Sequence, residues 1–197
     1  MYCLRGRKDA NQFAFVKPTP DLAVVPHEVG VWAMESRQFA RRDTMMTKLT
    51  RWLASPGAQR IAIVGQGGSG KSSLAQHFLH EMMPSNRVRL VFFLQADCLM
   101  NLVKGYRALF SQLMGMLGRK ETSPPDKDEE LCSSVHTLLR DAAVTWLCVL
   151  DDVPSPMVQD LEQHGLGWLL KENAGGFPWR SGKTIVTSRF RKWMDSP

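Results

Sequence analysis

The segment at residues 65–72, which reads GQGGSGKS, constrains the fold of this 197-residue chain more than any other part of the sequence. It matches the pattern G-x-x-x-x-G-K-[ST], in which glycines let successive backbone N–H groups point inward and form a nest for phosphate oxygens. An apolar run at 61–64 precedes the segment, and a helical pattern at 71–83 follows it. A strand, a glycine-rich loop and a helix in that order predict a phosphate-binding loop.

The residue types in this loop predict separate roles. Lys71 would reach the β- and γ-phosphates as a point charge, and the positive end of the following helix would add to its effect. Ser72 would be a ligand of Mg²⁺, because this ion prefers hard oxygen ligands, and Ser73 would lie beside the α-phosphate. The expected nucleotide-binding residues of the loop are Gly65, Gln66, Gly67, Gly68, Ser69, Gly70, Lys71, Ser72 and Ser73.

Apolar runs alternate with amphipathic helical patterns along the chain. The runs are continuous rather than alternating with polar residues, which is typical of strands buried on both faces of a sheet. They lie at 61–64, 88–96, 146–150 and 183–187. The helical patterns lie at 44–54, 71–83, 99–113, 131–139 and 157–171. We therefore predict the α/β class, with a three-layer sandwich around a mostly parallel sheet.

Two further segments bring charged side chains to the expected binding edge of this sheet. The strand at 147–150 ends in Asp151 and Asp152, and the carboxyl ends of strands in open α/β sheets are where ligands bind. Asp151 would hold Mg²⁺ together with Ser72, and Asp152 would orient or deprotonate an attacking water. The strand at 183–187 leads to Arg189, whose guanidinium can bind a γ-phosphate with a bidentate fork. The expected catalytic residues are Lys71, Asp151, Asp152 and Arg189, and the expected metal ligands are Ser72 and Asp151.

The ends of the chain and its composition limit the remaining possibilities. Residues 1–38 have no sustained period and contain three prolines, which predicts an N-terminal arm or linker of low order before a domain over 39–197. Lys and Arg number 25 against 19 Asp and Glu, a net charge of +6, but no basic run interleaves with aromatic residues. A dedicated nucleic-acid surface is therefore not indicated.

The expected location follows from the cysteines and the apolar runs. The four cysteines form no C-x-x-C pair and lie near no histidine at zinc spacing, which fits a reduced protein. The N-terminus lacks the apolar core of a signal peptide. The longest apolar runs hold about five residues, whereas about 20 are needed to cross a bilayer. We expect a cytoplasmic protein without a membrane segment.

Taken together, these segments resemble the nucleotide-binding part of the NB-ARC group of STAND switch ATPases, P-loop NTPases that include plant resistance proteins and apoptosome scaffolds. The resemblance covers roughly residues 39–190. It is carried by residues 63–75, 147–153 and 182–189. Upstream, residues 39–43 (FARRD) are similar to the family's segment that packs against adenine, which makes Arg42 an expected nucleotide contact.

The resemblance implies a fold and a function. The strand at 184–187 would lie between the strand before the phosphate loop and the strand that carries the acids, and Arg189 would sense the γ-phosphate. The ligand would be ATP or ADP with Mg²⁺, hydrolysis would be slow, and nucleotide exchange would drive assembly with protein partners, self-association included. The family's helical and winged-helix subdomains would lie beyond Pro197.

Two other functions stay open from the sequence. One is a P-loop ATPase or kinase-type enzyme that acts on a small molecule or a nucleic acid. The other is an interaction module that no longer binds nucleotide, although the intact Lys71, Ser72, Asp151 and Asp152 argue against it. A GTPase and an ABC ATPase are disfavoured because the chain has neither an N-K-x-D nor an L-S-G-G-Q segment.

Overall fold

The computed structural model describes residues 12–16, 42–55, 60–82, 88–119, 123–142, 144–154 and 182–189, with the backbone alone at 12–16. The elements in chain order are β1 (Gln12–Val16), α1 (Asp43–Ala54), β2 (Arg60–Val64), α2 (Lys71–Met82), β3 (Leu90–Gln95), α3 (Leu99–Met116), α4 (Asp128–Ala142), β4 (Trp146–Asp151) and β5 (Gly182–Ser188). The predicted helix at 157–171 lies outside the described residues. None of the helices in the described ranges is long and apolar enough to cross a membrane.

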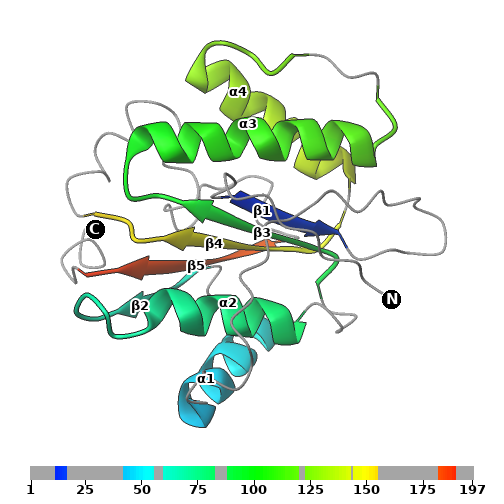
Figure 1. Cartoon of the computed structure of the whole chain (residues 1–197). Helices are drawn as coiled ribbons and strands as arrows, with labels where there is room; N and C mark the ends of the chain where they lie inside the picture. The colour runs from blue at the N-terminus through cyan, green and yellow to red at the C-terminus, as the bar shows by residue number, and fades with distance from the viewer. Residues whose placement is uncertain are drawn as a thin grey trace.

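One five-stranded sheet with the order β1-β3-β4-β5-β2 organises the described chain. Strands β3, β4, β5 and β2 pair in parallel, and β1 pairs with β3 in antiparallel orientation. Helices α1 and α2 cover one face of the sheet, and α3 and α4 cover the other (Figure 1). The predicted three-layer α/β sandwich with a mostly parallel sheet is confirmed. The position of β5 between β2 and β4, which the resemblance implied, is also confirmed.

Strand β1 differs from the expectation for the N-terminal segment. Residues 1–38 were predicted to form an arm, but within them the backbone of β1 aligns with β3, from Gln12 opposite Leu94 to Val16 opposite Leu90. The apolar run of β1 covers only residues 13–16 and has no recognisable motif beside it, whereas the equally short run of β2 is followed at once by the glycine-rich loop. No sequence signal therefore distinguished this strand from the surrounding arm.

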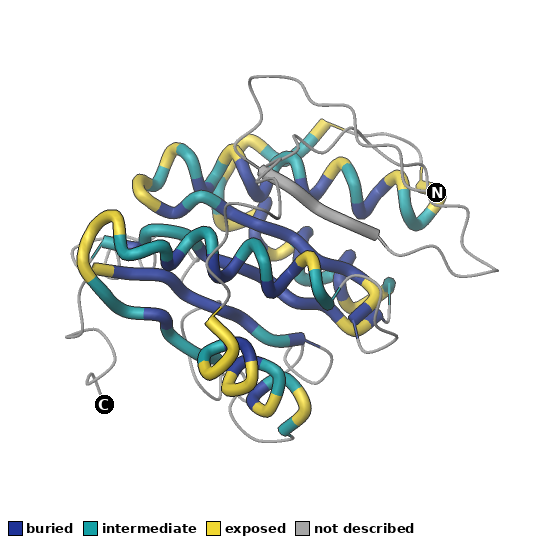
Figure 2. The backbone as a smooth tube through the Cα atoms, turned by 60° about the horizontal axis from the view of Figure 1, so that its bottom comes forward, coloured by how far each residue is buried: buried dark blue, intermediate teal, exposed yellow. Residues whose placement is uncertain are grey.

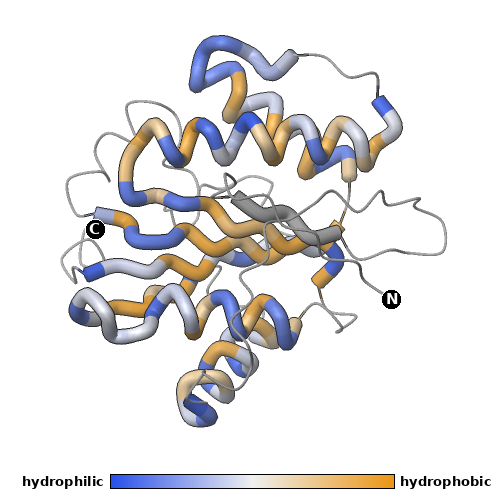
Figure 3. Tube along the Cα trace, in the orientation of Figure 1, coloured by the Kyte–Doolittle hydropathy of each residue, from blue (hydrophilic) through white to orange (hydrophobic). Residues whose placement is uncertain are grey.

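The central strands explain why the apolar runs in the sequence are continuous. Alternate residues of β3 face opposite cores, because side chains of a strand point to opposite faces of a sheet. Phe92 and Leu94 pack into the core under α3 and α4, whereas Val91 and Phe93 pack into the core over α1 and α2. Figure 2 shows the central strands as buried, and Figure 3 shows them as apolar up to their polar carboxyl ends. A polar residue at any of these positions would face one of the two cores.

Helix α1 is tied to strand β5 through one lysine. The Nζ atom of Lys183 donates hydrogen bonds to the carbonyl oxygens of Trp52, at 2.8 Å, and Ser55, at 2.6 Å. The same atom lies 5.0 Å from the centre of the Trp52 ring. Burial lowers the pKa of Lys183 from its usual value. A cation at the carbonyl end of a helix is favourable, so this contact stabilises the last turn of α1 and fixes it to the sheet.

The first residues of β4 and β5 meet in a contact that admits only glycine. Trp146 lies opposite Gly182 in the parallel register. Its indole ring is buried, and the centroid of this ring lies 5.6 Å from the centroid of the Phe92 ring. A Cβ atom added to Gly182 would lie 1.8 Å from Cε2 of Trp146, well inside van der Waals contact. The glycine therefore lets the tryptophan lie flat against the neighbouring strand.

Replacement of Gly182 by alanine should destabilise the fold by about 1–3 kcal/mol, the usual cost of forcing extra volume into a packed core. Gly115→Ala is the matched control, because a Cβ there meets nothing within 4 Å and alanine favours the helix. Chemical denaturation should show a lower midpoint for Gly182→Ala and an equal or higher one for Gly115→Ala. Equal stability of Gly182→Ala and the unmodified protein would contradict the contact.

Candidate functional site

The glycine-rich loop joins the carboxyl end of β2 to the first turn of α2. Gly68 and Gly70 have φ angles of 72° and 77°, a backbone conformation that favours glycine. The N–H of Ser69 donates to the carbonyl oxygen of Gln66 at 3.3 Å, and the N–H of Leu74 donates to that of Gly70 at 2.9 Å. The loop thus turns tightly and passes directly into the helix, as its sequence predicts.

Lys71, the first residue of α2, lies folded against this loop. Its side chain is buried, with 8% of its surface exposed. The Nζ atom donates to the carbonyl oxygens of Gly65 and Gln66, both at 2.9 Å. These two bonds compensate the burial of the charge and hold the ammonium group inside the curve of the backbone.

Arg42 stands on the other side of the loop, immediately before α1. Its NH2 atom donates to the carbonyl oxygen of Ser69 at 2.6 Å. A Cβ atom at Gly70 would lie 3.3 Å from the same nitrogen. The residue that the resemblance singled out as a nucleotide contact therefore touches the phosphate loop. The rest of that segment, residues 39–41, lies outside the described residues.

Asp151 ends β4 at the same edge of the sheet as the loop (Figure 1). Its Oδ1 atom accepts a hydrogen bond from the Thr187 hydroxyl at 2.6 Å. Burial raises the pKa of Asp151 from its usual value, and the charge of Asp152 acts in the same direction. Hydrogen bonds from Thr187 and Ser72 and the charge of Lys71 oppose this rise. These effects show that Ser72 and Lys71 lie close to Asp151, although Lys71 and Asp151 are 80 positions apart in the chain.

Asp152 turns away from the strand and pairs with Arg189. Its φ angle of 57° is uncommon for a residue other than glycine, although aspartate tolerates it better than most. Arg189 donates from Nε to Oδ1 at 3.2 Å and from NH2 to Oδ2 at 2.9 Å. Arg189 is 58% exposed, and the hydrogen bond and charge of Asp152 raise its pKa. The two predicted catalytic residues thus contact each other.

Thr187 belongs to this site, and the sequence reasoning did not select it. The residue is completely buried. Its hydroxyl accepts a hydrogen bond from the N–H of Asp152 at 2.8 Å while it donates to Asp151. Its neighbour Ser188 donates from Oγ to the carbonyl oxygen of Val153 at 2.7 Å. The only signal was a pair of hydroxyl residues before Arg189, and such residues are common at strand ends.

Ser72 and Asp151 have the donor chemistry that Mg²⁺ requires. Both offer oxygen, and the hydrogen bond between them brings a hydroxyl next to a carboxylate. Within the described ranges no group of three or more His, Cys, Asp or Glu could hold a metal. A cation here would therefore complete its shell with phosphate oxygens and water, which is how Mg²⁺ is usually bound.

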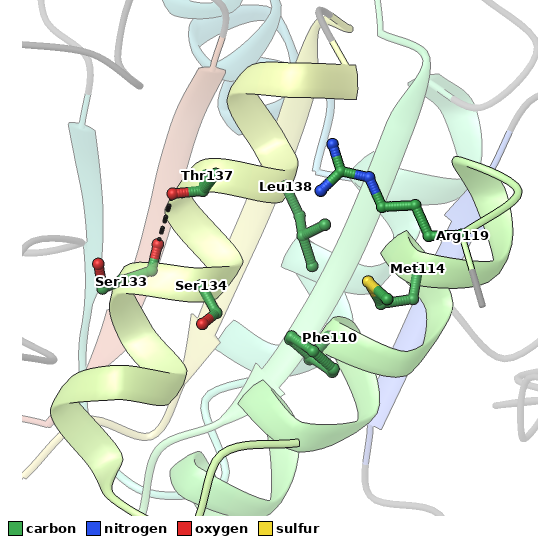
Figure 4. Close-up of a pocket in the computed structure, with 7 residues that line it drawn as sticks. All are labelled: Phe110, Met114, Arg119, Ser133, Ser134, Thr137 and Leu138. Atoms are coloured by element: carbon green, nitrogen blue, oxygen red, sulfur yellow. Dashed lines mark hydrogen bonds between the residues drawn. The ribbon is translucent and has the colours of Figure 1, made fainter. Parts of the chain in front are cut away.

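A second concavity lies between α3 and α4, apart from this site. Its volume is about 230 Å³, and Figure 4 shows its lining residues on α3, on α4 and at Arg119, which follows α3. Its lining residues are Phe110, Met114, Arg119, Ser133, Ser134, Thr137 and Leu138. Arg119 is paired with Asp141 at 2.5 Å. None of the residues predicted for nucleotide binding lines this groove.

A parallel sheet with a glycine loop and lysine after β2, and paired acids after β4, defines the chain as a P-loop nucleotide-binding domain. The family model described as the NB-ARC domain matches residues 42–174, which is more than half of the chain. The chain therefore belongs to the NB-ARC family and is a nucleotide-binding signalling module. No curated protein matches it. Strand β5, with Thr187 and Arg189, lies beyond the matched residues.

Proposed function

We propose that this domain is a cytoplasmic ATP/ADP switch whose slow, Mg²⁺-dependent hydrolysis is coupled to assembly with protein partners, other copies of the chain included. One observation carries the proposal: the Lys71 ammonium, the Ser72 hydroxyl, the Asp151 carboxylate and the Arg189 guanidinium converge on one edge of the sheet. No disulfide joins the described cysteines Cys98, Cys132 and Cys148, which supports a reducing compartment.

The loop would bind the phosphates through its backbone and through Lys71. Two of the three ammonium protons already point to Gly65 and Gln66. A modest rotation of the long side chain would direct the ammonium to the β- and γ-phosphates without a change in the backbone. The backbone N–H groups from Gly65 to Gly70 and the start of α2 would complete the cradle, and Ser73 would lie near the α-phosphate.

Ser72 and Asp151 would hold Mg²⁺ between the protein and the nucleotide. When bound, this ion would neutralise charge on the β- and γ-phosphate oxygens. Asp151 would act from a fixed position, since the Thr187 hydroxyl restrains its Oδ1 atom. Arg42, which touches Ser69, would extend the site from the phosphate loop to the start of α1.

The ion pair of Asp152 and Arg189 supports slow hydrolysis. Asp152 would have to release Arg189 before its carboxylate could orient a water, and Arg189 would have to leave Asp152 before it could contact a γ-phosphate. ATP would offer this guanidinium a γ-phosphate as an alternative anionic partner, and ADP has no γ-phosphate. The exchange of one anionic partner for another would let the domain distinguish the two nucleotides.

Lys71→Ala should weaken binding of a fluorescent ATP analogue in Mg²⁺ by at least about tenfold, because it removes the cation that faces the phosphates. Lys48→Ala is the matched control, since Lys48 is exposed on α1. A parallel titration with the GTP analogue should show weaker binding to the unmodified protein. Indifference of the affinity to Lys71→Ala would contradict the proposed site.

Asp152→Asn should slow hydrolysis by about 100-fold, the range expected for loss of a general base, and leave ATP affinity equal or slightly tighter. The affinity should not fall, because Arg189 loses its competing carboxylate. Asp141→Asn, in α4, is the control for loss of a paired acid elsewhere. Turnover by the unmodified protein on the order of 10 per second would instead favour a P-loop enzyme that acts on a small molecule or nucleic acid.

A further inference from the structure

The Thr187 hydroxyl joins two residues that the proposed function assigns to different steps. It donates its single proton to Oδ1 of Asp151 at 2.6 Å and accepts the N–H of Asp152 at 2.8 Å. The backbone carbonyl of Thr187 also accepts the N–H of Val153 at 2.9 Å. One residue of β5 therefore holds three consecutive residues, namely the last residue of β4 and the two that follow it.

The sheet geometry explains why a side chain is needed at this point. The parallel register of β4 with β5 runs from Trp146 opposite Gly182 to Leu150 opposite Val186. Beyond it, Asp151 still pairs with Gln95 of β3, and the chain then reaches the φ angle of 57° at Asp152. The N–H of Asp152 is then bonded by a side-chain oxygen rather than by a backbone carbonyl. A hydroxyl can supply that acceptor and at the same time donate its proton to a carboxylate.

A second buried threonine on β5 shows that this arrangement is specific. Thr184 is also completely buried, but its hydroxyl has no hydrogen-bond partner in the part of the chain that the structure describes. Burial alone therefore does not give a hydroxyl of β5 a hydrogen-bond partner. Thr184 lies opposite residues of both neighbouring strands, β2 and β4, whereas Thr187 lies opposite β2 alone, at the edge where the acids emerge.

We infer that Thr187 is a positioning residue of the nucleotide site: its hydroxyl holds the Asp151 carboxylate where it can share a cation with Ser72, and it holds the backbone turn that directs Asp152 to Arg189. This inference rests on the proposed function. Asp151 is held from both sides, by Ser72 of α2 and by Thr187 of β5. The bond from Ser72 would be given up if its hydroxyl became a metal ligand, whereas the bond from Thr187 would remain.

The test measures metal affinity separately from nucleotide affinity. Free Mn²⁺, a paramagnetic substitute for Mg²⁺, is measured by electron paramagnetic resonance in the presence of ADP, and ADP binding is measured in EDTA. Thr187→Val should weaken Mn²⁺ binding by about 10-fold or more, the usual cost of losing a partner that orients a metal ligand. Its affinity for ADP in EDTA should stay within about threefold of the unmodified protein. Thr187→Ser keeps the hydroxyl and should restore the metal affinity.

Thr184→Val is the matched control, because it makes the same change on the same strand where the hydroxyl has no partner in the described part of the chain. It should leave both affinities unchanged. If Thr187→Val does not fold, Thr187→Cys against Thr187→Ser provides the comparison, because a thiol of similar size is a poor donor. Thr187→Cys should then show the weaker Mn²⁺ binding.

The outcomes separate this inference from the proposed function. An unmodified protein that binds neither ADP nor Mn²⁺·ADP would overturn both. An unmodified protein that binds both, with Mn²⁺ affinity equal in Thr187→Val or Thr187→Cys, would overturn only the role of Thr187. Equal losses of ADP affinity with and without metal would also overturn it, because Thr187 would then act through the phosphate loop.

Discussion

The parallel pairing of β5 with both β2 and β4 is the constraint on which the rest of the site depends. The phosphate loop follows β2 and the acids follow β4, and these two strands do not touch each other. β5 fixes the distance between them and contributes Thr187 to the gap, and Arg189 follows directly after it. Loss of either pairing would separate Lys71 from Asp151, even if the loop and the acids kept their local structure.

Helix α1 is fixed to the same framework at both of its ends. Arg42 contacts the carbonyl oxygen of Ser69 in the phosphate loop before the helix begins, and Lys183 of β5 holds the carbonyl groups at its end. The helix therefore connects the loop after β2 with the strand beside it. A nucleotide that displaced the loop would also displace α1, because Arg42 links the two. Helix α1 therefore offers a physical route from the binding edge to a surface that faces away from this edge.

Much of the fold could be predicted because its signals are local. The glycine-lysine motif located Lys71, and continuous apolar runs located β2 to β5 because both faces of the sheet are covered. Strand β1 and the role of Thr187 could not be predicted, for two different reasons. The short apolar run of β1 has no motif beside it, whereas the equally short run of β2 leads directly into the phosphate loop. The Thr187 hydroxyl acquires its two partners only when strands far apart in the sequence align, and no spacing rule encodes that alignment.

Hydrogen–deuterium exchange of the chain with and without Mg²⁺·ATP tests most directly that one nucleotide site is built from three separate segments. Slower exchange is expected at residues 65–73, 151–153 and 187–189 together, because all three segments would contact the ligand or its cation. Amides of α3 and α4 that line the groove of Figure 4 should change little. No change in the phosphate loop, or protection confined to α3 and α4, would contradict the central claim.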